Sequence, residues 1–246
     1  MKSKTLTLLS IGIALFLAAC QKDKQPDANS NVLKVKNYSE KVVSSDGDSI
    51  VANYNLSYDA NNRITALSQV EVPGNKFLFT YESDNKYSME IYLKGALSIH
   101  EDFFLNSRHS IDSTYQYNDE EDTTSEKYLY NANNQLTTVK EFYNSVVDNV
   151  TTYTYDNNGN VVKTTDTDNQ VETFDYYPDL VYAMPFTTPL QSAIPAHLVK
   201  NHKITSNGYV VANIVSTYTF DSKNRISTIT QTLDDGGVAT QTFTYF

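Results

Sequence analysis

The sequence predicts an all-β protein: an antiparallel up-and-down meander of repeated β-hairpins, curled into an open or closed barrel-like sheet. Three observations support this prediction. A seven-residue turn pattern recurs along the chain, apolar and polar residues alternate on both sides of it, and helical periodicity is nearly absent. The chain is also rich in Tyr, with 19 residues, and in Phe, with 11, both of which favour strands.

The turn pattern is an aromatic residue, an Asp or Asn, three turn-forming residues, a polar residue and an aliphatic one. It occurs at residues 58–64, 130–136, 155–161 and 220–226. Its fifth position, which is Asn62, Asn134, Gly159 or Asn224, carries the residue types that tolerate a positive φ. The Asp or Asn can accept bonds from backbone N–H groups two residues on. The pattern predicts hairpins built on a type I turn closed by a left-handed residue and its bulge. A weaker copy at 81–87 places Asn85 in the left-handed position.

Strands flank these turns on both sides. The segment Tyr54–Tyr58 alternates with a period of two, and the segment Arg225–Thr230 is rich in Thr and Ile. From Val32 onward we expect roughly sixteen strands in a continuous series. Further turns are expected at residues 46–48, 73–75, 94–95, 118–122, 166–169, 206–208 and 234–237.

One insertion, residues 177–199, interrupts the series and holds Pro178, Pro185, Pro189 and Pro195. Proline excludes a central strand. A short helix could run from Thr188 through Leu198 with a proline in its first turn, although Pro195 would interrupt it. Two interpretations remain open. The insertion covers an exposed edge or opening of the sheet, or it forms a plug or lid over a binding cavity.

The N-terminal residues predict export. Two lysines precede an apolar stretch over residues 5–19, and the stretch ends Leu17-Ala18-Ala19-Cys20. The apolar stretch is shorter than the roughly 20 residues that span a membrane. The ending resembles the lipobox of bacterial lipoproteins, which implies cleavage before Cys20, a diacylglyceryl group on its thiol and acylation of the new N-terminus. A plain secreted protein with a stray cysteine is the alternative.

We therefore expect a signal peptide at 1–19, a lipidated Cys20 with a flexible tether over 20–31, and a single all-β domain over 32–246. Gln21 is not the Asp that holds some lipoproteins at the inner membrane, so the expected location is the outer membrane. The segment Gln21–Lys24 loosely resembles surface-export signals. A periplasmic and a surface-facing orientation both remain open.

The net charge of −10 argues against nucleic acid as a partner, because the phosphate backbone would be repelled. The longest basic stretch is only Lys200–Lys203. The sequence predicts a membrane as partner, through Cys20, together with an unidentified glycan, peptide or protein ligand.

The turn pattern, repeated over residues 54–246, resembles the YD repeats of Rhs-type and teneurin-type proteins, whose hairpins coil into β-shells. With the lipobox, the tether and the late Pro-rich insertion, the chain is more similar to a family of uncharacterised Gram-negative lipoproteins described as having a porin-like fold. That resemblance implies a curled meander or barrel and no known activity. The chain departs from the repeat pattern at Asn131, Gln135 and Asn160, which replace the usual Asp or Arg.

A barrel that spans the membrane is not expected. Such a barrel needs a continuous apolar face toward lipid, whereas the second face of the strands carries Asn53, Asn55 and Ser57, or Thr217 and Thr219.

The sequence carries no recognisable catalytic motif, cofactor-binding motif or metal-ligand spacing. The histidines at 100, 109, 197 and 202 are expected on the surface. The acidic stretches 118–122, 156–160 and 166–169 lack the spacing of a calcium loop and are expected as solvated turns.

Three functional hypotheses follow. The first is a non-enzymatic envelope lipoprotein that acts as a binding or scaffold module. The second is an envelope hydrolase, for example on glycans, which would need two converging carboxyl groups, one with a raised pKa. The third is a structural spacer or assembly partner that offers an exposed strand edge.

Overall fold

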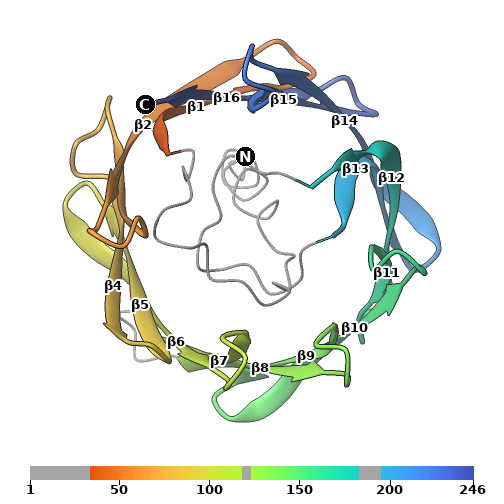
Figure 1. Ribbon diagram of the computed structural model, residues 1–246. Coiled ribbons are helices and arrows are strands. Elements are labelled where there is room, and N and C mark those ends of the chain that lie inside the picture. The colour runs from red at the N-terminus through yellow and green to blue at the C-terminus, as the bar shows by residue number, and fades with distance from the viewer. Residues whose placement is uncertain (1–33, 118–122, 183–194) are drawn as a thin grey trace, which may run out of the picture.

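The computed structural model describes residues 34–117, 123–182 and 195–246. These residues form sixteen antiparallel strands in a closed meander barrel, without helices (Figure 1). The predicted fold class is confirmed. The strands are β1 (Val35–Val43), β2 (Ser49–Tyr58), β3 (Ile64–Gln69), β4 (Lys76–Ser83), β5 (Lys86–Leu93), β6 (Ala96–Leu105), β7 (Ile111–Tyr117), β8 (Thr123–Tyr130), β9 (Leu136–Tyr143), β10 (Val146–Tyr155), β11 (Val161–Thr165), β12 (Gln170–Val181), β13 (His197–Ser206), β14 (Tyr209–Phe220), β15 (Ile226–Leu233) and β16 (Val238–Tyr245).

The first and last strands close the barrel. β1 pairs with β16 over most of its length, with Lys41 opposite Thr240, and the N–H of Phe246 donates to the carbonyl of Lys34 at 3.1 Å. Each of the sixteen strands has a neighbour on both sides. The expectation of an exposed strand edge for assembly is therefore wrong for this part of the chain, because closure pairs every strand.

The two faces of the wall differ in character. On β2, Leu56 is buried whereas its neighbours Asn55 and Ser57 are exposed. Side chains that point toward the axis of a closed barrel converge and those that point outward diverge, so the buried row faces inward. The outward row of the last three strands is mostly Thr and also includes Val215 and Val238; its threonines are Thr217, Thr219, Thr228, Thr230, Thr232, Thr240, Thr242 and Thr244.

The barrel has two rims. One carries the Asp- and Asn-based turns at 59–63, 131–135, 156–160 and 221–225, and we call it the Asp rim. The opposite rim carries the turns at 44–48, 94–95, 144–145, 166–169, 207–208 and 234–237. Because β1 begins and β16 ends at the Asp rim, Lys34 and Phe246 both lie there.

The structure corrects part of the expected insertion. Residues 177–181 belong to β12 and residues 197–199 belong to β13. Pro178 is tolerated inside β12 because the pairing with β13 is irregular between Tyr176 and Val181, so no ladder bond is required of the proline. Leu198 lies in a strand, so the helix predicted to reach it is wrong at that end. The rest of that helix lies outside the described residues.

Candidate functional site

The repeated turn is held by one carboxylate. Asp59 Oδ1 accepts hydrogen bonds from the backbone N–H of Asn61 at 2.9 Å and of Arg63 at 2.8 Å. Its Oδ2 accepts a bond from Arg63 Nε at 2.7 Å. A backbone hydrogen bond from the N–H of Asp59 to the carbonyl of Arg63 closes the same turn. One side chain therefore fixes five residues of the turn.

The predicted left-handed residues are confirmed in all four strong copies. The φ angles are 64° at Asn62, 60° at Asn134, 86° at Gly159 and 59° at Asn224. The prediction for Asn85 is wrong, because its φ is not positive. That loop contains only two residues between the paired Ser83 and Lys86, so it has no room for the longer turn.

Two further copies of the turn escaped sequence analysis. Asn106 Oδ1 accepts from the N–H groups of Arg108 and Ser110, with His109 left-handed at φ 56°. Leu105 stands where the pattern has an aromatic residue. The second copy is the acidic turn at 166–170, on the opposite rim. There an Asp166 carboxylate oxygen accepts two backbone bonds, as in the other turns.

Tyrosine hydroxyls tie most hairpins at the Asp rim to the preceding one. Seven tyrosines of the described chain donate to a backbone carbonyl one hairpin earlier, at 2.6 to 3.0 Å. The pairs are Tyr58 with Val35, Tyr81 with Ile64, Tyr130 with Ile111, Tyr155 with Leu136, Tyr176 with Val161, Tyr218 with Val199 and Tyr245 with Ile226. These hydrogen bonds place each phenol ring beside the turn of the preceding hairpin.

Two turns use these rings to hold an arginine. The Arg63 guanidinium pairs with Asp59 and lies 4.0 Å above the Tyr81 ring. Arg225 does the same with Asp221, at 2.6 Å, and with Tyr245, again at 4.0 Å. The Asp and Arg of the pattern are visible in the sequence, but their aromatic partner lies in the next hairpin and was not predicted.

The turn at 156–160 has the same carboxylate but no arginine. Asn160, only 2% exposed, donates from Nδ2 to Asp156 Oδ2 at 2.9 Å and accepts at Oδ1 from the N–H of His197. Burial acts to raise the pKa of Asp156, but hydrogen bonds from the side chain and backbone of Asn160 outweigh it and hold the pKa below its usual range. A pocket of about 430 Å³ opens here, lined by Asp156, Asn158, Asn160, Val162, Phe174, Asp175, Tyr176, Pro178 and His197.

A second pocket, of about 200 Å³, lies nearer the opposite rim and brings carboxyl groups together. Glu101, Glu126 and Glu141 line it from three strands. Burial raises the pKa of Glu101 to about 7, and the charge of Glu126 adds to the shift. Burial also raises the pKa of Glu126, although Tyr128 donates a hydrogen bond to its carboxyl. The carboxyl groups that the hydrolase hypothesis requires are therefore present, and sequence alone could not place them together.

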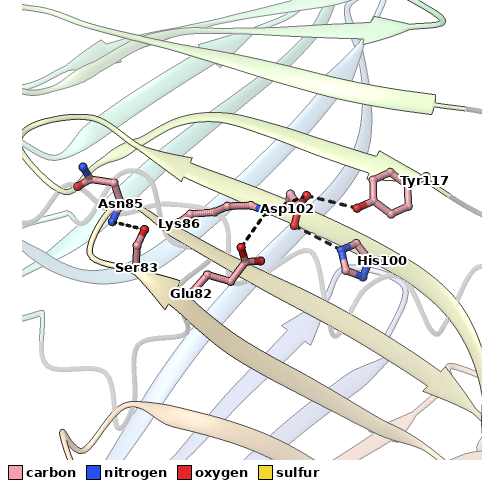
Figure 2. Close-up of polar contacts among 7 residues, drawn as sticks. All are labelled: Glu82, Ser83, Asn85, Lys86, His100, Asp102 and Tyr117. Atoms are coloured by element: carbon pink, nitrogen blue, oxygen red, sulfur yellow. Dashed lines mark hydrogen bonds and ion pairs between the residues drawn. The ribbon is translucent and has the colours of Figure 1, made fainter.

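The outward face carries a polar network on β4 to β7. Figure 2 shows Asp102 between Lys86, at 3.4 Å, His100, at 3.3 Å, and Tyr117, at 3.3 Å. Lys86 also pairs with Glu82 at 3.0 Å. These side chains come from neighbouring strands of one wall and link them in the way that cross-strand pairs stabilise a sheet. We interpret the network as structural.

The four histidines differ from the expectation that all lie on the surface. His109 is exposed, whereas the other three are partly buried. His202 stacks on Phe174 and contacts Glu172 at 3.1 Å. Within the described ranges, no group of three or more His, Cys, Asp or Glu side chains could hold a metal ion.

Exposed hydrophobic side chains gather at the opposite rim. Phe104, Tyr115, Leu129 and Val215 are exposed elsewhere on the outward face, and the group at the opposite rim consists of Ile50, Val51, Val70, Leu93, Leu97, Tyr143, Val146, Val147, Tyr209, Val210 and Val211. All members of this group lie at the ends of strands that meet the hairpin tips of that rim. The predicted Cys20, the tether at 20–31 and the acidic stretch 118–122 lie outside the described residues.

Comparison with known proteins gives one family match. Residues 130–171 match the family model of the RHS repeat. This segment contains the turns at 131–135 and 156–160, so the resemblance to YD repeats is confirmed. No curated protein matches the chain.

Two solved structures share the fold. A porin-like protein from Bacteroides uniformis superposes with a TM-score of 0.63 at 13% identity, covering 86% of this chain and 96% of the other. A porin-like protein from Bacteroides vulgatus gives a TM-score of 0.59 at 12% identity, covering 87% and 99%. The expected likeness to a porin-like fold is confirmed. No helix among the described residues is long and apolar enough to cross a membrane.

Proposed function

We propose that the protein is a cell-envelope lipoprotein whose barrel is a non-enzymatic binding or scaffold module. Cys20 carries the lipid, residues 20–31 form the tether, and the anchor lies in the outer membrane. The RHS repeat match and the two porin-like neighbours support an envelope protein of this fold.

The observation that carries the proposal is the Thr-rich outward face of β14 to β16. Rows of Thr such as Thr217 and Thr219 cannot contact lipid favourably, since a membrane-spanning barrel needs an apolar outer band. A barrel with this surface needs a separate attachment to the membrane, and the lipobox at Cys20 supplies one. Lys34 begins the barrel at the Asp rim. The tether therefore reaches the barrel at that rim, and the chain from Cys20 to Lys34 spans at most about 50 Å when fully extended.

Metabolic labelling with an alkyne fatty acid tests the anchor. We expect the full chain to incorporate the label and to fractionate with outer membranes, and Cys20→Ala to do neither while its barrel still folds. A chain that labels and fractionates identically after Cys20→Ala would contradict the proposal. Protease accessibility on intact cells then distinguishes a surface-facing from a periplasmic barrel.

The second candidate function is hydrolysis by carboxyl groups. It is favoured by Glu101 and Glu126, which lie in one pocket with raised pKa values. One protonated and one ionised carboxyl group is the arrangement that glycoside hydrolysis uses. A panel of glycans incubated with the protein tests it: hydrolysis that Glu101→Gln and Glu126→Gln both abolish would establish an enzyme.

The third candidate, a spacer or assembly partner, cannot use a strand edge within the described barrel. Its contact surface would be the exposed apolar side chains of the opposite rim, such as Val146 and Val211. Sedimentation of the full chain in detergent, compared with a variant carrying Val146→Ser and Val211→Ser, tests whether this rim holds an assembly together.

A further inference from the structure

Three turns of the Asp rim share one framework and differ in a single feature. Each has an Asp whose carboxylate accepts two backbone N–H groups, and each is followed by a tyrosine whose hydroxyl bonds to the residue just after the turn. The three sets are Asp59 with Tyr81, Asp156 with Tyr176 and Asp221 with Tyr245.

In two of the three sets an arginine of the chain completes the framework. The Cζ atoms of Arg63 and Arg225 each lie 4.0 Å from the centre of the tyrosine ring, and each Nε bonds to the Asp Oδ2. A guanidinium over an aromatic ring and beside a carboxylate gains both cation–π attraction and a charge-assisted hydrogen bond. The framework is therefore a binding site for a guanidinium group, and in two of the three sets an arginine of the chain occupies it.

In the third set the arginine is replaced by the shorter and neutral Asn160. The pocket of about 430 Å³ opens at this point, with Asp156, Asp175 and Tyr176 among its lining residues. No cation pairs with Asp156 in the described part of the chain. The Nδ2 of Asn160 also lies 3.3 Å from His197 Nδ1.

The Asp156 carboxylate is bonded by groups of its own turn, including the backbone of Gly159. It accepts the N–H groups of Asn158 and Asn160 on Oδ1 and the Asn160 amide on Oδ2. A carboxylate offers about four acceptor positions. Oδ2 accepts the Asn160 amide, so a guanidinium that bonds to this oxygen shares it with Asn160.

We propose that the pocket at Asp156 binds a guanidinium group of a ligand, held by the Asp156 carboxylate and the Tyr176 ring as Asp59 and Tyr81 hold Arg63. Asp175 adds a second carboxylate to the lining. A peptide arginine and a free arginine-like metabolite share this chemistry. The assignment names the ligand class of the binding module proposed above and rests on that function.

The probe is N-acetyl-arginine amide, titrated by calorimetry into the full chain purified in a neutral detergent. Its neutral isostere, N-acetyl-citrulline amide, is the matched control ligand. We expect the arginine compound to bind at least about tenfold more tightly than the citrulline compound, since a hydrogen bond to a charged group contributes that much or more. Equal binding of the two compounds would overturn the proposal.

Two variants test the pocket itself. Asp156→Asn is expected to weaken binding of the arginine compound by about tenfold or more without unfolding the turn, because Asn131 holds the sibling turn with the same backbone bonds. Asn160→Arg should fill the pocket with the chain's own guanidinium and abolish binding. Asp59→Asn, in a turn already filled by Arg63, is the matched control and should leave binding unchanged.

Each outcome decides something. Unchanged binding after Asp156→Asn would overturn the site, even if Asn160→Arg failed to fold. Equal affinity for N-acetyl-lysine amide would overturn the guanidinium assignment. A short arginine peptide that binds more tightly than free arginine identifies a peptide as the source of the group, and the reverse identifies a metabolite. Anchoring through Cys20 is measured separately by fractionation, so its failure is distinguishable from a failure to bind.

Discussion

The phenol hydroxyl of Tyr155 donates a 2.9 Å hydrogen bond to the backbone carbonyl of Leu136, 19 residues earlier. Leu136 is the aliphatic residue that ends one repeated turn, and Tyr155 is the aromatic residue that begins the next. The two ends of the sequence pattern are therefore bonded to each other across neighbouring hairpins. This bond accounts for the tyrosine that begins this copy of the pattern; the copy at 220–226 begins with Phe220, and Tyr218 donates the corresponding bond to Val199.

Tyr155→Phe is expected to destabilise the barrel by about 1 kcal/mol, because the Leu136 carbonyl loses its partner while the ring stays packed. Urea unfolding measures the change. Tyr209→Phe is the matched control, since Tyr209 is 78% exposed, and should leave the midpoint unchanged. Equal effects at the two positions would show that the rim bond contributes nothing to stability.

Asn224 tests the left-handed corner of the turn. Its φ is 59° and its side chain is exposed, so substitutions there act mainly through the backbone. Asn224→Val should cost about 1 to 2 kcal/mol, because a β-branched residue is strained at positive φ. Asn224→Gly should be neutral or slightly stabilising. Thermal unfolding of both variants gives the comparison, and a harmless Val would contradict the predicted geometry.

Gly74 allows two hairpin tips to touch at the opposite rim. Its carbonyl accepts a 2.9 Å bond from the N–H of Gly95, and an added Cβ would lie 2.6 Å from that nitrogen. Gly74→Ala should therefore separate the two tips, at a cost of about 1 to 3 kcal/mol. Gly237→Ala is the control, because its Cβ would lie 3.1 Å from the side-chain oxygen of Asp235 and 3.6 Å from the backbone oxygen of Val43, an ordinary contact distance. Calorimetric unfolding should show the larger loss at Gly74.

Glu101 predicts a pH dependence of stability. Burial raises its pKa from 4.5 to about 7, so the folded protein retains a proton that the unfolded chain has released in this range. The stability that the protonated Glu101 carboxyl contributes is fully present below pH 4.5 and is lost as the pH rises through 7. At that pH the loss in unfolding free energy approaches about 3 kcal/mol. Glu101→Gln should flatten the slope of unfolding free energy between pH 5 and 8 relative to the parent. Some slope should remain, because burial also raises the pKa of Glu126 and Glu141. Exposed Asp84→Asn should leave the slope unchanged.

Much of the fold could be predicted from local sequence, because the turn is a local structure. Asn62 and Gly159 occupy positions that only a few residue types accept, so their identity reports their backbone angles. His109 can also adopt a positive φ, but the Leu105 before it broke the pattern and hid that turn. Asn85 is the opposite case. Its residue type predicted a left-handed position in a five-residue turn, but the loop between Ser83 and Lys86 has only two residues.

What sequence could not supply depends on pairing between strands. Closure requires β1 to meet β16, and no local pattern specifies that contact. The convergence of Glu101 and Glu126 depends on the register of β6, β7 and β8, in which Thr114 lies opposite Glu126. The pocket at Asp156 could be suspected from Asn160, which stands where two other copies of the turn have an arginine. Its aromatic wall, Tyr176, lies in a different hairpin and becomes visible only in three dimensions.

The pairing of β1 with β16 has a consequence for how the barrel assembles. Fourteen of the sixteen strands, β2 to β15, have both of their paired neighbours adjacent in sequence. The contact between β1 and β16 joins opposite ends of the domain and carries the largest loop-closure entropy. Until that contact forms, β1 and the last strand in place each present an unpaired row of N–H and C=O groups. A chain truncated before β16 would keep those edges permanently, and we expect it to exchange strands with other copies and aggregate.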